Sequence, residues 1–426
     1  MELLVEGKKN VNTTVIVPGD KSISHRSVII GAIAEGVTEI RNFLPGQDCL
    51  STVKCMQQLG VTIEEIAPTH LKVHGRGLHG LSEPRDVLYV GNSGTTIRLL
   101  TGLLAAQKFF SVLNGDASIK RRPMERVTAP LRQMGAEIWG REGGKYAPLA
   151  IKGNALQGLG YTTPVASAQI KSALLLAGLY AEGKTTIIEP AQSRDHSEKM
   201  LKGFGADIVC EGLTTVIRPS FLHAQNIYVP GDISSAAFFL VAGAIIPGAR
   251  ITVQKVGLNR TRTGILDALR KMGAHISIDN IENYSGEPLG DITVRGDDGL
   301  RGIEMGGELI PRLIDEIPVL AVAGAVAQGT TIIKDAAELK VKESNRLQAI
   351  SAELRKFGIK IEETADGLII EGGEGYRGAV CESYHDHRIA MACALAGLVA
   401  SGTTVVKNAE CIDISFPGFA QALGQF

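Results

Sequence analysis

A chain of 426 residues exceeds what one hydrophobic core fills, so we expect two domains of about 200 residues each. The 44 Lys and Arg residues nearly balance the 45 Asp and Glu residues, which leaves a net charge of −1. This balance argues against a nucleic-acid or membrane-surface role. The six cysteines show no Cys-x-x-Cys spacing and the N-terminus lacks the apolar stretch of a signal peptide, so we expect a cytoplasmic protein with reduced thiols.

The first stretch with chemical character is residues 17–26, VPGDKSISHR, which joins a β-rich run to an apolar helix. Its Pro-Gly pair predicts a turn, and Asp20 is one of three candidate N-caps. Lys21, His25 and Arg26 lie at the helix start, where the helix dipole already favours anions. Cations at this place indicate an oxyanion or phosphate site, and a solvated basic turn is the plain alternative.

Two interleaved motifs recur along the chain with a period of roughly 70 residues. One is a helix end followed by a small-residue turn and a strand, first present at residues 31–40 (GAIAEGVTEI). The other is a helix followed by a glycine that fits a left-handed cap and then a short strand. Its glycines are Gly60, Gly135, Gly205, Gly273 and Gly358, with a truncated copy at Gly424. The VPGD motif at residue 17 returns at residue 229, so the six units predict two domains of three repeats each.

Polar and charged residues gather at the six predicted helix starts, whereas the helix bodies are rich in Ala, Leu and Gly. The starts are residues 21–28, 91–100, 165–176, 231–240, 314–322 and 384–392. Asn92 or Ser93 can cap the second helix, and Ser167 can cap the third. Converging N-termini would create a strongly positive region with few net charges. Routine capping explains the Ser, Asp and Asn residues but not Lys21 or Arg388.

Two basic clusters lie outside these starts, at residues 113–127 and 339–350. In the second cluster we expect Lys342 and Arg346, and likewise Glu343 and Leu347, to lie one turn apart on a helix. Taken alone, each cluster is typical of a solvated surface.

Residues 178–185, GLYAEGKT, match the pattern of a phosphate-binding P-loop. A P-loop follows a strand and opens a helix, whereas here a helix precedes and a strand follows. We therefore reject nucleotide binding at this segment. His196, His385 and His387 lack the spacing of metal ligands, so we expect no metal site.

Eight segments of the chain, in order, resemble the 5-enolpyruvylshikimate-3-phosphate synthase family of enolpyruvyl transferases. They are PGDKSISHR, GNSGTTIRLL, GDASIKRRPMERV, ASAQIKSALLLAGL, SRDHSEKML, IDEIPVLAVAGA, ELKVKESNRL and DHRIAMA. The resemblance implies an α/β fold of two similar domains, each made of three βαβαββ repeats with buried helices inside the sheets. It places domain I at residues 1–18 plus 231–426, domain II at residues 19–230, and hinges near Pro18–Lys21 and Pro230–Asp232.

The resemblance also implies a monomeric transferase with an active site in the interdomain cleft, which closes on its substrates. The implied reaction moves the enolpyruvyl group of phosphoenolpyruvate to the 5-hydroxyl of shikimate 3-phosphate through a tetrahedral ketal, on the route to chorismate and aromatic amino acids. It needs no metal or organic cofactor. Asp315 is the implied base, and Glu343 is the implied proton donor to C3, with Lys21 as its rival.

The resemblance assigns the remaining contacts residue by residue. Shikimate 3-phosphate is implied to contact Lys21, Ser22, Arg26, Ser167, Ala168, Gln169, Ser193, Asp315 and Lys342. Phosphoenolpyruvate is implied to contact Lys21, Gly94, Arg122, Gln169, Arg346, His387 and Arg388.

The chain departs from many relatives at Ile414, where they carry a lysine, and from some relatives at Glu338, where they carry Asn. The segments SAQIK, RDHSE and NRTR resemble the glyphosate-tolerant subgroup, whereas Gly94 resembles the sensitive one. Two alternatives stay open. One is a UDP-N-acetylglucosamine enolpyruvyl transferase, although the mobile-loop cysteine of that family is absent. The other is a non-catalytic repeat scaffold that binds phosphate groups.

Overall fold

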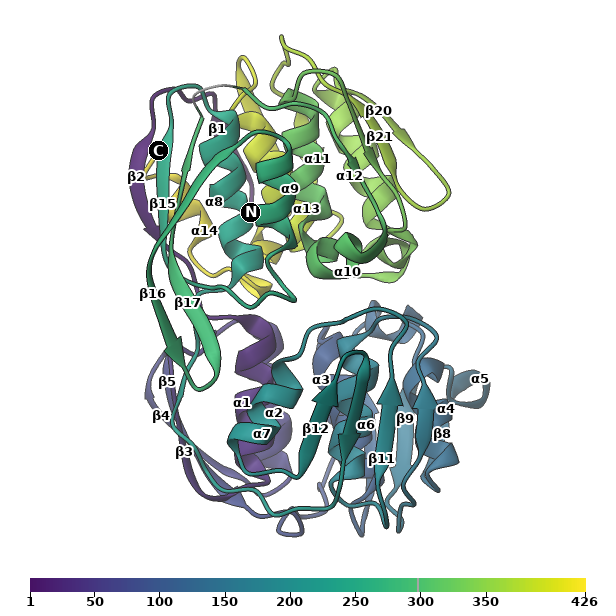
Figure 1. The fold of residues 1–426 in the computed structure, drawn as a ribbon. Helices are drawn as coiled ribbons and strands as arrows, with labels where there is room; N and C mark the ends of the chain where they lie inside the picture. Colours follow the sequence, from purple (N-terminus) through teal and green to yellow (C-terminus); the bar gives the residue numbers. More distant parts are fainter. Residues whose placement is uncertain (297–298) are drawn as a thin grey trace. The chain divides into compact units, whose positions relative to one another are not determined.

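The computed structural model describes residues 1–296 and 299–426, which form an α/β fold of two units (Figure 1). Unit 1 comprises Met1–Pro18, Pro230–Asn283 and Pro288–Phe426. Unit 2 comprises Gly19–Val229 and the short segment Tyr284–Glu287. Within these described ranges, no helix combines the length and the apolar character needed to cross a lipid bilayer.

Unit 2 is built from short strands and helices in alternation. Its strands are β3 (Glu35–Arg41), β4 (Thr62–Ala67), β5 (His70–Arg76), β6 (Leu88–Tyr89), β7 (Phe110–Asn114), β8 (Glu137–Gly140), β9 (Tyr146–Lys152), β10 (Gly160–Thr162), β11 (Thr185–Ile188), β12 (Ile208–Glu211), β13 (Thr214–Ile217) and β14 (Ile227–Tyr228). Its helices are α1 (Lys21–Ala32), α2 (Gln47–Gln58), α3 (Gly94–Ala105), η1 (Ile119–Arg121), α4 (Glu125–Gln133), α5 (Arg141–Gly144), α6 (Ala168–Gly178) and α7 (His196–Gly203). The strands form sheets in the orders β14-β3-β5-β4, β6-β7-β9-β8 and β10-β11-β13-β12.

Unit 1 follows the same plan. Its strands are β1 (Leu3–Glu6), β2 (Asn12–Ile16), β15 (Arg250–Gly257), β16 (His275–Tyr284), β17 (Glu287–Arg295), β18 (Glu304–Met305), β19 (Thr330–Ile333), β20 (Lys360–Glu363), β21 (Leu368–Glu371), β22 (Val380–Glu382) and β23 (Thr403–Lys407). Its helices are α8 (Ile233–Ile245), α9 (Gly264–Lys271), η2 (Gly307–Leu309), α10 (Ile310–Leu313), η3 (Ile314–Glu316), α11 (Ile317–Val326), η4 (Ala337–Val341), α12 (Arg346–Lys356), α13 (His387–Gly397), η5 (Ala409–Ile414) and α14 (Phe419–Leu423). The sheets have the orders β16-β17-β15-β2, β18-β19-β21-β20 and β1-β23-β22.

Each complete repeat has the order βαβαββ. In the repeat from β6 to β9, the first two strands pair in parallel, and the last two form an antiparallel hairpin against them. The first helix of each repeat lies inside the unit: α1, α3, α6, α8, α11 and α13 are buried over nearly their whole length. An all-apolar helix needs a partner on every side, which explains why α8, α11 and α13 pack side by side (Figure 1). The second helices, such as α2, bury one face only.

The chain exchanges strands where it passes from one unit to the other. Strand β2 pairs in parallel with β15 of unit 1, yet the helix that follows it is α1 of unit 2. Strand β14 pairs with β3 of unit 2, yet it leads into α8 of unit 1. The order of strand, turn and helix predicted at both VPGD motifs is confirmed. Asp20 caps α1 by accepting the N–H of Ile23 at 2.9 Å, and Asp232 caps α8 by accepting the N–H of Ser234 at 2.8 Å.

The repeated glycines end their helices as predicted, with one exception. Gly60, Gly135, Gly205, Gly273 and Gly358 all have φ between 88° and 102°. The prediction for Gly424 is wrong, because its φ is −66°. No strand follows α14 in the described chain, so the backbone there does not need the reversal that a left-handed residue provides.

The long hairpin β16–β17 has its body in unit 1 and its tip in unit 2. At the tip, the Tyr284 ring lies 5.3 Å from the Tyr228 ring, and Ser285 Oγ donates to the carbonyl of Asn226 at 3.0 Å. Glu287 Oε1 lies 2.7 Å from Nδ1 of the buried His196. Four residues of the hairpin therefore belong to the packing of α7 and β14.

Candidate active site

In unit 2, the start of α1 is fixed to three other helices. The ammonium of Lys21, the first residue of α1, forms an ion pair with Asp48 in the first turn of α2. The guanidinium of the buried Arg26 donates to Ser197 Oγ at 2.7 Å and to Ser172 Oγ at 2.8 Å. Arg26 also donates to the carbonyl of Ser22 at 2.9 Å. The cations predicted here are thus held by α2, α6 and α7, and Asp48 is a partner that the sequence did not indicate.

Arg122 lies over the start of α3. Ser93 caps this helix by accepting the N–H of Thr96 at 3.1 Å, as one of the two predicted caps. Arg122 is buried and donates to Ser118 Oγ at 3.1 Å. A Cβ atom on Gly94, the first helical residue, would lie 2.8 Å from Nη1 of Arg122. The guanidinium and the free N–H groups of the helix start therefore share one place, which favours an anion there.

The N-terminus of α6 lies beside Gln169 and the buried residues Ser167 and Ser193. Ser167 is the residue before α6, but its side chain makes no capping hydrogen bond, and Ala168 is the first helical residue. Gln169 donates to Thr95 Oγ1 at 3.1 Å and accepts from Arg98 of α3. The hydroxyl of Ser193 is buried and has no hydrogen-bond partner within the described residues.

Arg98 is a polar member of this group that the sequence analysis missed. It lies in the apolar body of α3, is 5% exposed, and donates to the carbonyl of Pro123 at 3.2 Å as well as to Gln169. An arginine inside an otherwise apolar helix was the available signal, because a buried charge requires partners.

In unit 1, Arg346 is surrounded by three carboxylates. It is 1% exposed, and its donors lie 2.8 Å from Asp386 Oδ2, 3.2 Å from Asp315 Oδ1 and 2.6 Å from Glu343 Oε2. Burial alone would lower the pKa of this guanidinium, but the three carboxylates raise it above its ordinary value. Lys342 Nζ lies 3.5 Å from the same oxygen of Asp315. The predicted base and the predicted acid are therefore both attached to one permanent cation.

The helical spacing predicted for Lys342 and Glu343 is wrong. Helix α12 begins at Arg346, and Asn345 is its N-cap, accepting the N–H of Gln348 at 3.3 Å. The preceding Ser344 Oγ donates to Asp386 Oδ2 at 3.0 Å, which fixes this segment outside the helix. Lys342 and Glu343 therefore reach Asp315 and Arg346 from an irregular segment rather than from successive turns.

The start of α13 completes the group in unit 1. Asp386 is the N-cap and accepts the N–H of Arg388 at 3.0 Å. Burial would raise the pKa of Asp386, but the charge of Arg346 lowers it below its ordinary value. His387 is buried, and Arg388 is 9% exposed. Across the described residues, the guanidinium of Arg388 has no carboxylate partner.

Two other groupings in the described residues carry titratable side chains that could bind a metal. They are Glu353 with Cys381 and Cys393, and Asp195 with His196 and Glu287. Their side chains already bind one another or their neighbours: Glu353 accepts from Lys356 at 2.7 Å, and His196 is paired with Glu287.

The rejection of a P-loop at residues 178–185 is confirmed. Helix α6 ends at Gly178 and β11 begins at Thr185, so the segment joins a helix to a strand, the reverse of a P-loop.

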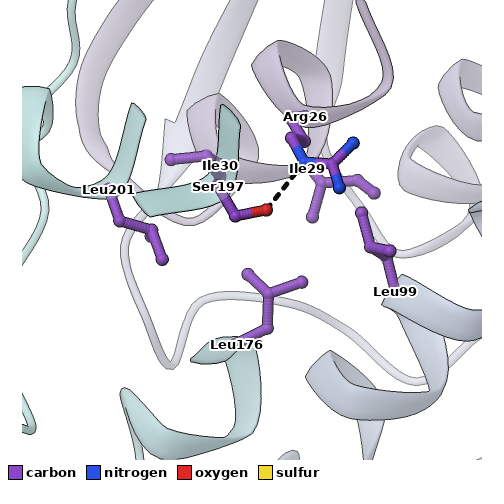
Figure 2. A pocket seen from close by; sticks show the side chains of 7 residues that line it. All are labelled: Arg26, Ile29, Ile30, Leu99, Leu176, Ser197 and Leu201. Carbon is purple, nitrogen blue, oxygen red and sulfur yellow. Dashed lines mark hydrogen bonds between the residues drawn. The ribbon is translucent and has the colours of Figure 1, made fainter. Parts of the chain in front are cut away.

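A pocket in unit 2 lies between α1, α3, α6 and α7 (Figure 2). Figure 2 shows Arg26 and Ser197 joined by their hydrogen bond at its side. The rest of the lining is apolar: Ile29, Ile30, Leu99, Leu176 and Leu201. The pocket has no room for a water molecule, so it is a packing gap behind Arg26 and not a place for a charged substrate.

The convergence of helix starts is confirmed within each unit. In unit 2, Arg26 joins α1 to α6, and Gln169 joins α6 to α3. In unit 1, Ser234 of α8 donates to Glu316 before α11, and Arg346 joins η3, α12 and α13. Each unit thus presents helix N-termini, fixed cations and, in unit 1, paired carboxylates. The fold and these groups define a protein that binds small polyanions and offers side chains for proton transfer.

Comparison with known proteins gives the family. The chain matches the family described as EPSP synthase (3-phosphoshikimate 1-carboxyvinyltransferase) over residues 5–423. It is 56% identical over 425 residues to the 3-phosphoshikimate 1-carboxyvinyltransferase of Desulforamulus reducens, covering 99% of each chain. It is 57% identical over 406 residues to that of Geobacillus kaustophilus, covering 95% of each chain. The structure of EPSP synthase from Acinetobacter baumannii superposes with a TM-score of 0.88 at 45% identity, covering 100% of this chain and 97% of that one. The chain belongs to the EPSP synthase family.

Proposed function

We propose that this chain transfers the enolpyruvyl group of phosphoenolpyruvate to the 5-hydroxyl of shikimate 3-phosphate, releasing phosphate, as a step of aromatic amino acid biosynthesis. Membership of the EPSP synthase family supports the reaction. The observation that carries the residue roles is the shared guanidinium of Arg346, with Asp315 at 3.2 Å and Glu343 at 2.6 Å. Two carboxylates at one cation are suited to taking up and returning protons in an addition followed by an elimination.

In the proposed addition step, Asp315 takes the proton of the 5-hydroxyl while the hydroxyl oxygen bonds to C2 of phosphoenolpyruvate. C3 receives a proton at the same time, which gives a tetrahedral ketal. In the elimination step, C3 loses a proton, the bond from C2 to the phosphate oxygen breaks, and phosphate leaves. The side chains take up two protons, one from the 5-hydroxyl and one from C3, and give one proton to C3. The other proton goes to the leaving phosphate, so the two steps balance without an oxidant, a metal or an organic cofactor.

The proton donor to C3 is either Glu343 or Lys21. The ion pair with Arg346 at 2.6 Å favours the ionised form of Glu343, which accepts a proton rather than donating one. Lys21 carries an ammonium group at the start of α1 that can donate a proton, and its contact with Asp48 stabilises the charged form. We propose Lys21 as the donor in the arrangement observed here, with Glu343 as the group that receives the proton from C3.

The substrate contacts that we propose follow the available donors. Shikimate 3-phosphate contacts the start of α1 and the start of α6, with the unpartnered hydroxyl of Ser193 beside them. Phosphoenolpyruvate contacts Arg122 over Gly94 and Arg388 on α13, since bidentate guanidinium groups suit carboxylate and phosphate oxygens. Arg346 holds the base and contributes its charge to the same substrate.

A phosphate-release assay tests the function directly. We expect release from phosphoenolpyruvate when shikimate 3-phosphate is the acceptor, and none when UDP-N-acetylglucosamine replaces it. Asp315→Asn keeps the size of the side chain but removes the base, so kcat should fall by about 10²- to 10⁴-fold. Release with UDP-N-acetylglucosamine alone would favour the alternative transferase, and binding of both substrates without release would favour the scaffold.

Replacing the two candidate donors separates their roles. We expect Lys21→Met to abolish both the forward reaction and the exchange of solvent deuterium into C3 of phosphoenolpyruvate. Glu343→Gln should still allow the first proton transfer and accumulate the tetrahedral ketal, because the second transfer is blocked. Normal deuterium exchange in the Lys21→Met protein would assign the first transfer to Glu343 instead.

A further inference from the structure

A buried ammonium lies behind the proposed shikimate 3-phosphate contacts, in a place that none of the assigned roles uses. Lys171 is on α6, one turn after Ser167, and is 2% exposed. Its Nζ lies 2.6 Å from Glu189 Oε2 and 2.6 Å from Glu198 Oε1, both of which are buried. Burying three charges is costly, so the arrangement needs an explanation beyond stability.

The two carboxylates flank a single loop. Glu189 directly follows β11, and Glu198 is the third residue of α7, so the loop between them covers residues 190–195. Ser193 lies inside this loop and carries the buried hydroxyl that has no partner within the described residues. One ammonium therefore fastens both ends of the loop that presents Ser193.

A neighbouring serine on each helix makes a second layer of contacts. Ser172 Oγ, beside Lys171, lies 2.6 Å from Ser197 Oγ, beside Glu198. Both hydroxyls accept from the guanidinium of Arg26 on α1, at 2.8 and 2.7 Å. The two layers together tie the start of α6, the loop at 190–195 and the start of α1 to one another. These are the three places that supply the proposed contacts to shikimate 3-phosphate in unit 2.

The charges of the cluster explain why Lys171 is its centre. Burial opposes the charge of Lys171, but the two carboxylates raise its pKa above the ordinary value. For Glu198, burial raises the pKa above its ordinary value, although the charge of Lys171 acts to lower it. With the ammonium removed, two carboxylates at hydrogen-bond distance from one point would repel each other, and the ends of the loop would separate.

We propose that Lys171 is a positioning residue that fixes the loop at 190–195 and the start of α6 for binding shikimate 3-phosphate. The inference rests on the proposed function only for the identity of the ligand. A positioning role differs from a merely structural role, because it predicts a loss of affinity for one substrate only. A misplacement of binding groups by about 1 Å costs up to about 10²-fold.

The test uses the full chain and two measurements. Calorimetry gives the dissociation constant of shikimate 3-phosphate alone, and the phosphate-release assay gives KM for each substrate. We expect Lys171→Met to weaken binding of shikimate 3-phosphate by about 10- to 100-fold, with KM for phosphoenolpyruvate within about 2-fold of wild type. Lys171→Arg keeps the charge and can bridge two carboxylates, so it should recover most of the affinity.

Lys356→Met is the matched control. It removes the ammonium that contacts the buried Glu353 at 2.7 Å in unit 1, and that carboxylate keeps its hydrogen bonds from Tyr384 and from the N–H of Glu382. We expect it to leave the affinity for shikimate 3-phosphate unchanged. If Lys171→Met does not fold, the double variant Lys171→Met/Glu198→Gln, which leaves one buried carboxylate, takes its place with the same expected loss.

The inference is overturned if the folded Lys171 variant binds shikimate 3-phosphate within 2-fold of wild type, or if both substrates weaken equally. It is also overturned if the Lys356 control loses the same affinity. A wild-type protein that binds shikimate 3-phosphate but releases no phosphate contradicts the proposed function while the binding comparison still decides the role of Lys171.

Discussion

His25 shows how a single buried side chain links three helices of unit 2. Its Nδ1 lies 2.7 Å from Thr52 Oγ1 on α2, and that hydroxyl lies 2.6 Å from Thr96 Oγ1 on α3. Burial and then the charges of Lys21 and Arg26 hold the pKa of His25 well below its ordinary value. The helix start thus keeps a neutral imidazole beside two cations.

This depressed pKa predicts a loss of stability in mild acid. Below pH 6.5, the ordinary pKa of histidine, the unfolded chain binds a proton at His25 that the folded chain does not bind. The folded state therefore loses stability relative to the unfolded state as the pH falls below 6.5. We expect the free energy of unfolding to drop by up to about 1.4 kcal/mol per pH unit from this residue. Urea unfolding between pH 7.5 and 5.5 checks this, and His25→Gln should remove the slope.

His223, which is exposed, gives the control for that series. His223→Gln should keep the wild-type slope between pH 7.5 and 5.5. An identical pH dependence in the His25→Gln and wild-type proteins would assign the acid sensitivity to other groups.

Gly94 makes a prediction about the contact with Arg122. A Cβ atom at this position would lie 2.8 Å from Arg122 Nη1, so Gly94→Ala forces the guanidinium to move. Because a flexible side-chain end can move cheaply, we expect little loss of stability but a rise in KM for phosphoenolpyruvate of about 10-fold or more. Steady-state phosphate release measures the change in KM.

Gly203→Ala is the matched control for that substitution. A Cβ atom there has nothing within 4 Å, although the residue also belongs to a helix of unit 2. We expect its KM values to equal those of wild type. A Gly94→Ala protein with unchanged KM for phosphoenolpyruvate would contradict the proposed role of Arg122.

At the scale of elements, the segments that resemble the tolerant subgroup turn out to fix helix starts. Lys171 of SAQIK pairs with Glu198 of RDHSE. Arg262 of NRTR donates to Asp232 at 3.1 Å and to Ser234 Oγ at 2.8 Å, at the start of α8. These side chains are buried and bind one another.

Of the helix caps of α8 and α12, the cap of α8 should contribute more to the free energy of unfolding. Asp232 accepts the N–H of Ser234 and pairs with Arg262, which is 2% exposed. Asp232→Ala removes the cap and leaves a buried guanidinium without this carboxylate, so we expect a loss of about 3–5 kcal/mol in the free energy of unfolding. Asn345→Ala removes the half-buried cap of α12 without removing a charge and should cost about 1 kcal/mol in the free energy of unfolding. Equal losses in urea unfolding would contradict this difference.

Local signals explain which elements could be predicted from the sequence. Left-handed glycines, N-caps and apolar helix bodies act within a few residues, so the repeats and the helix starts at Asp20, Ser93 and Asp386 could be predicted from the chain alone. The partners of Lys21 and Gln169, namely Asp48 and Arg98, depend on contacts between distant segments. The spacing of residues 342–347 fits a helix, but Ser344 binds the side chain of Asp386 and Asn345 caps the backbone, so the helix begins only at Arg346.

At the scale of the whole molecule, the exchanged strands make the two units differ in how many separate chain segments build their sheets. The sheets of unit 2 are formed by strands between residues 35 and 228, whereas two sheets of unit 1 take β1 and β2 from the first 16 residues. The hairpin tip in unit 2 could not be predicted from the sequence, since its alternation indicates pairing within the hairpin but not the packing of Tyr284 on Tyr228.

This inequality predicts how fragments behave. We expect a fragment of residues 19–229 to fold with its sheets complete, and a fragment of residues 230–426 to fail because β15 and β23 lose their partners β2 and β1. Fusing residues 1–18 to the second fragment through a flexible linker should restore its folding. Near-ultraviolet circular dichroism and urea unfolding test each piece, and a cooperative transition in residues 230–426 alone would refute the prediction.

The position of β2 also has a consequence for synthesis on the ribosome. Residues 12–16 are synthesised long before their partner β15, which is completed only at residue 257. At about 5–20 residues per second, the wait lasts roughly 12 to 48 s, during which residues 19–229 of unit 2 are synthesised. Strand β2 must therefore avoid pairing with other strands during this time, and its polar residues Asn12, Thr13 and Thr14 lower its tendency to aggregate.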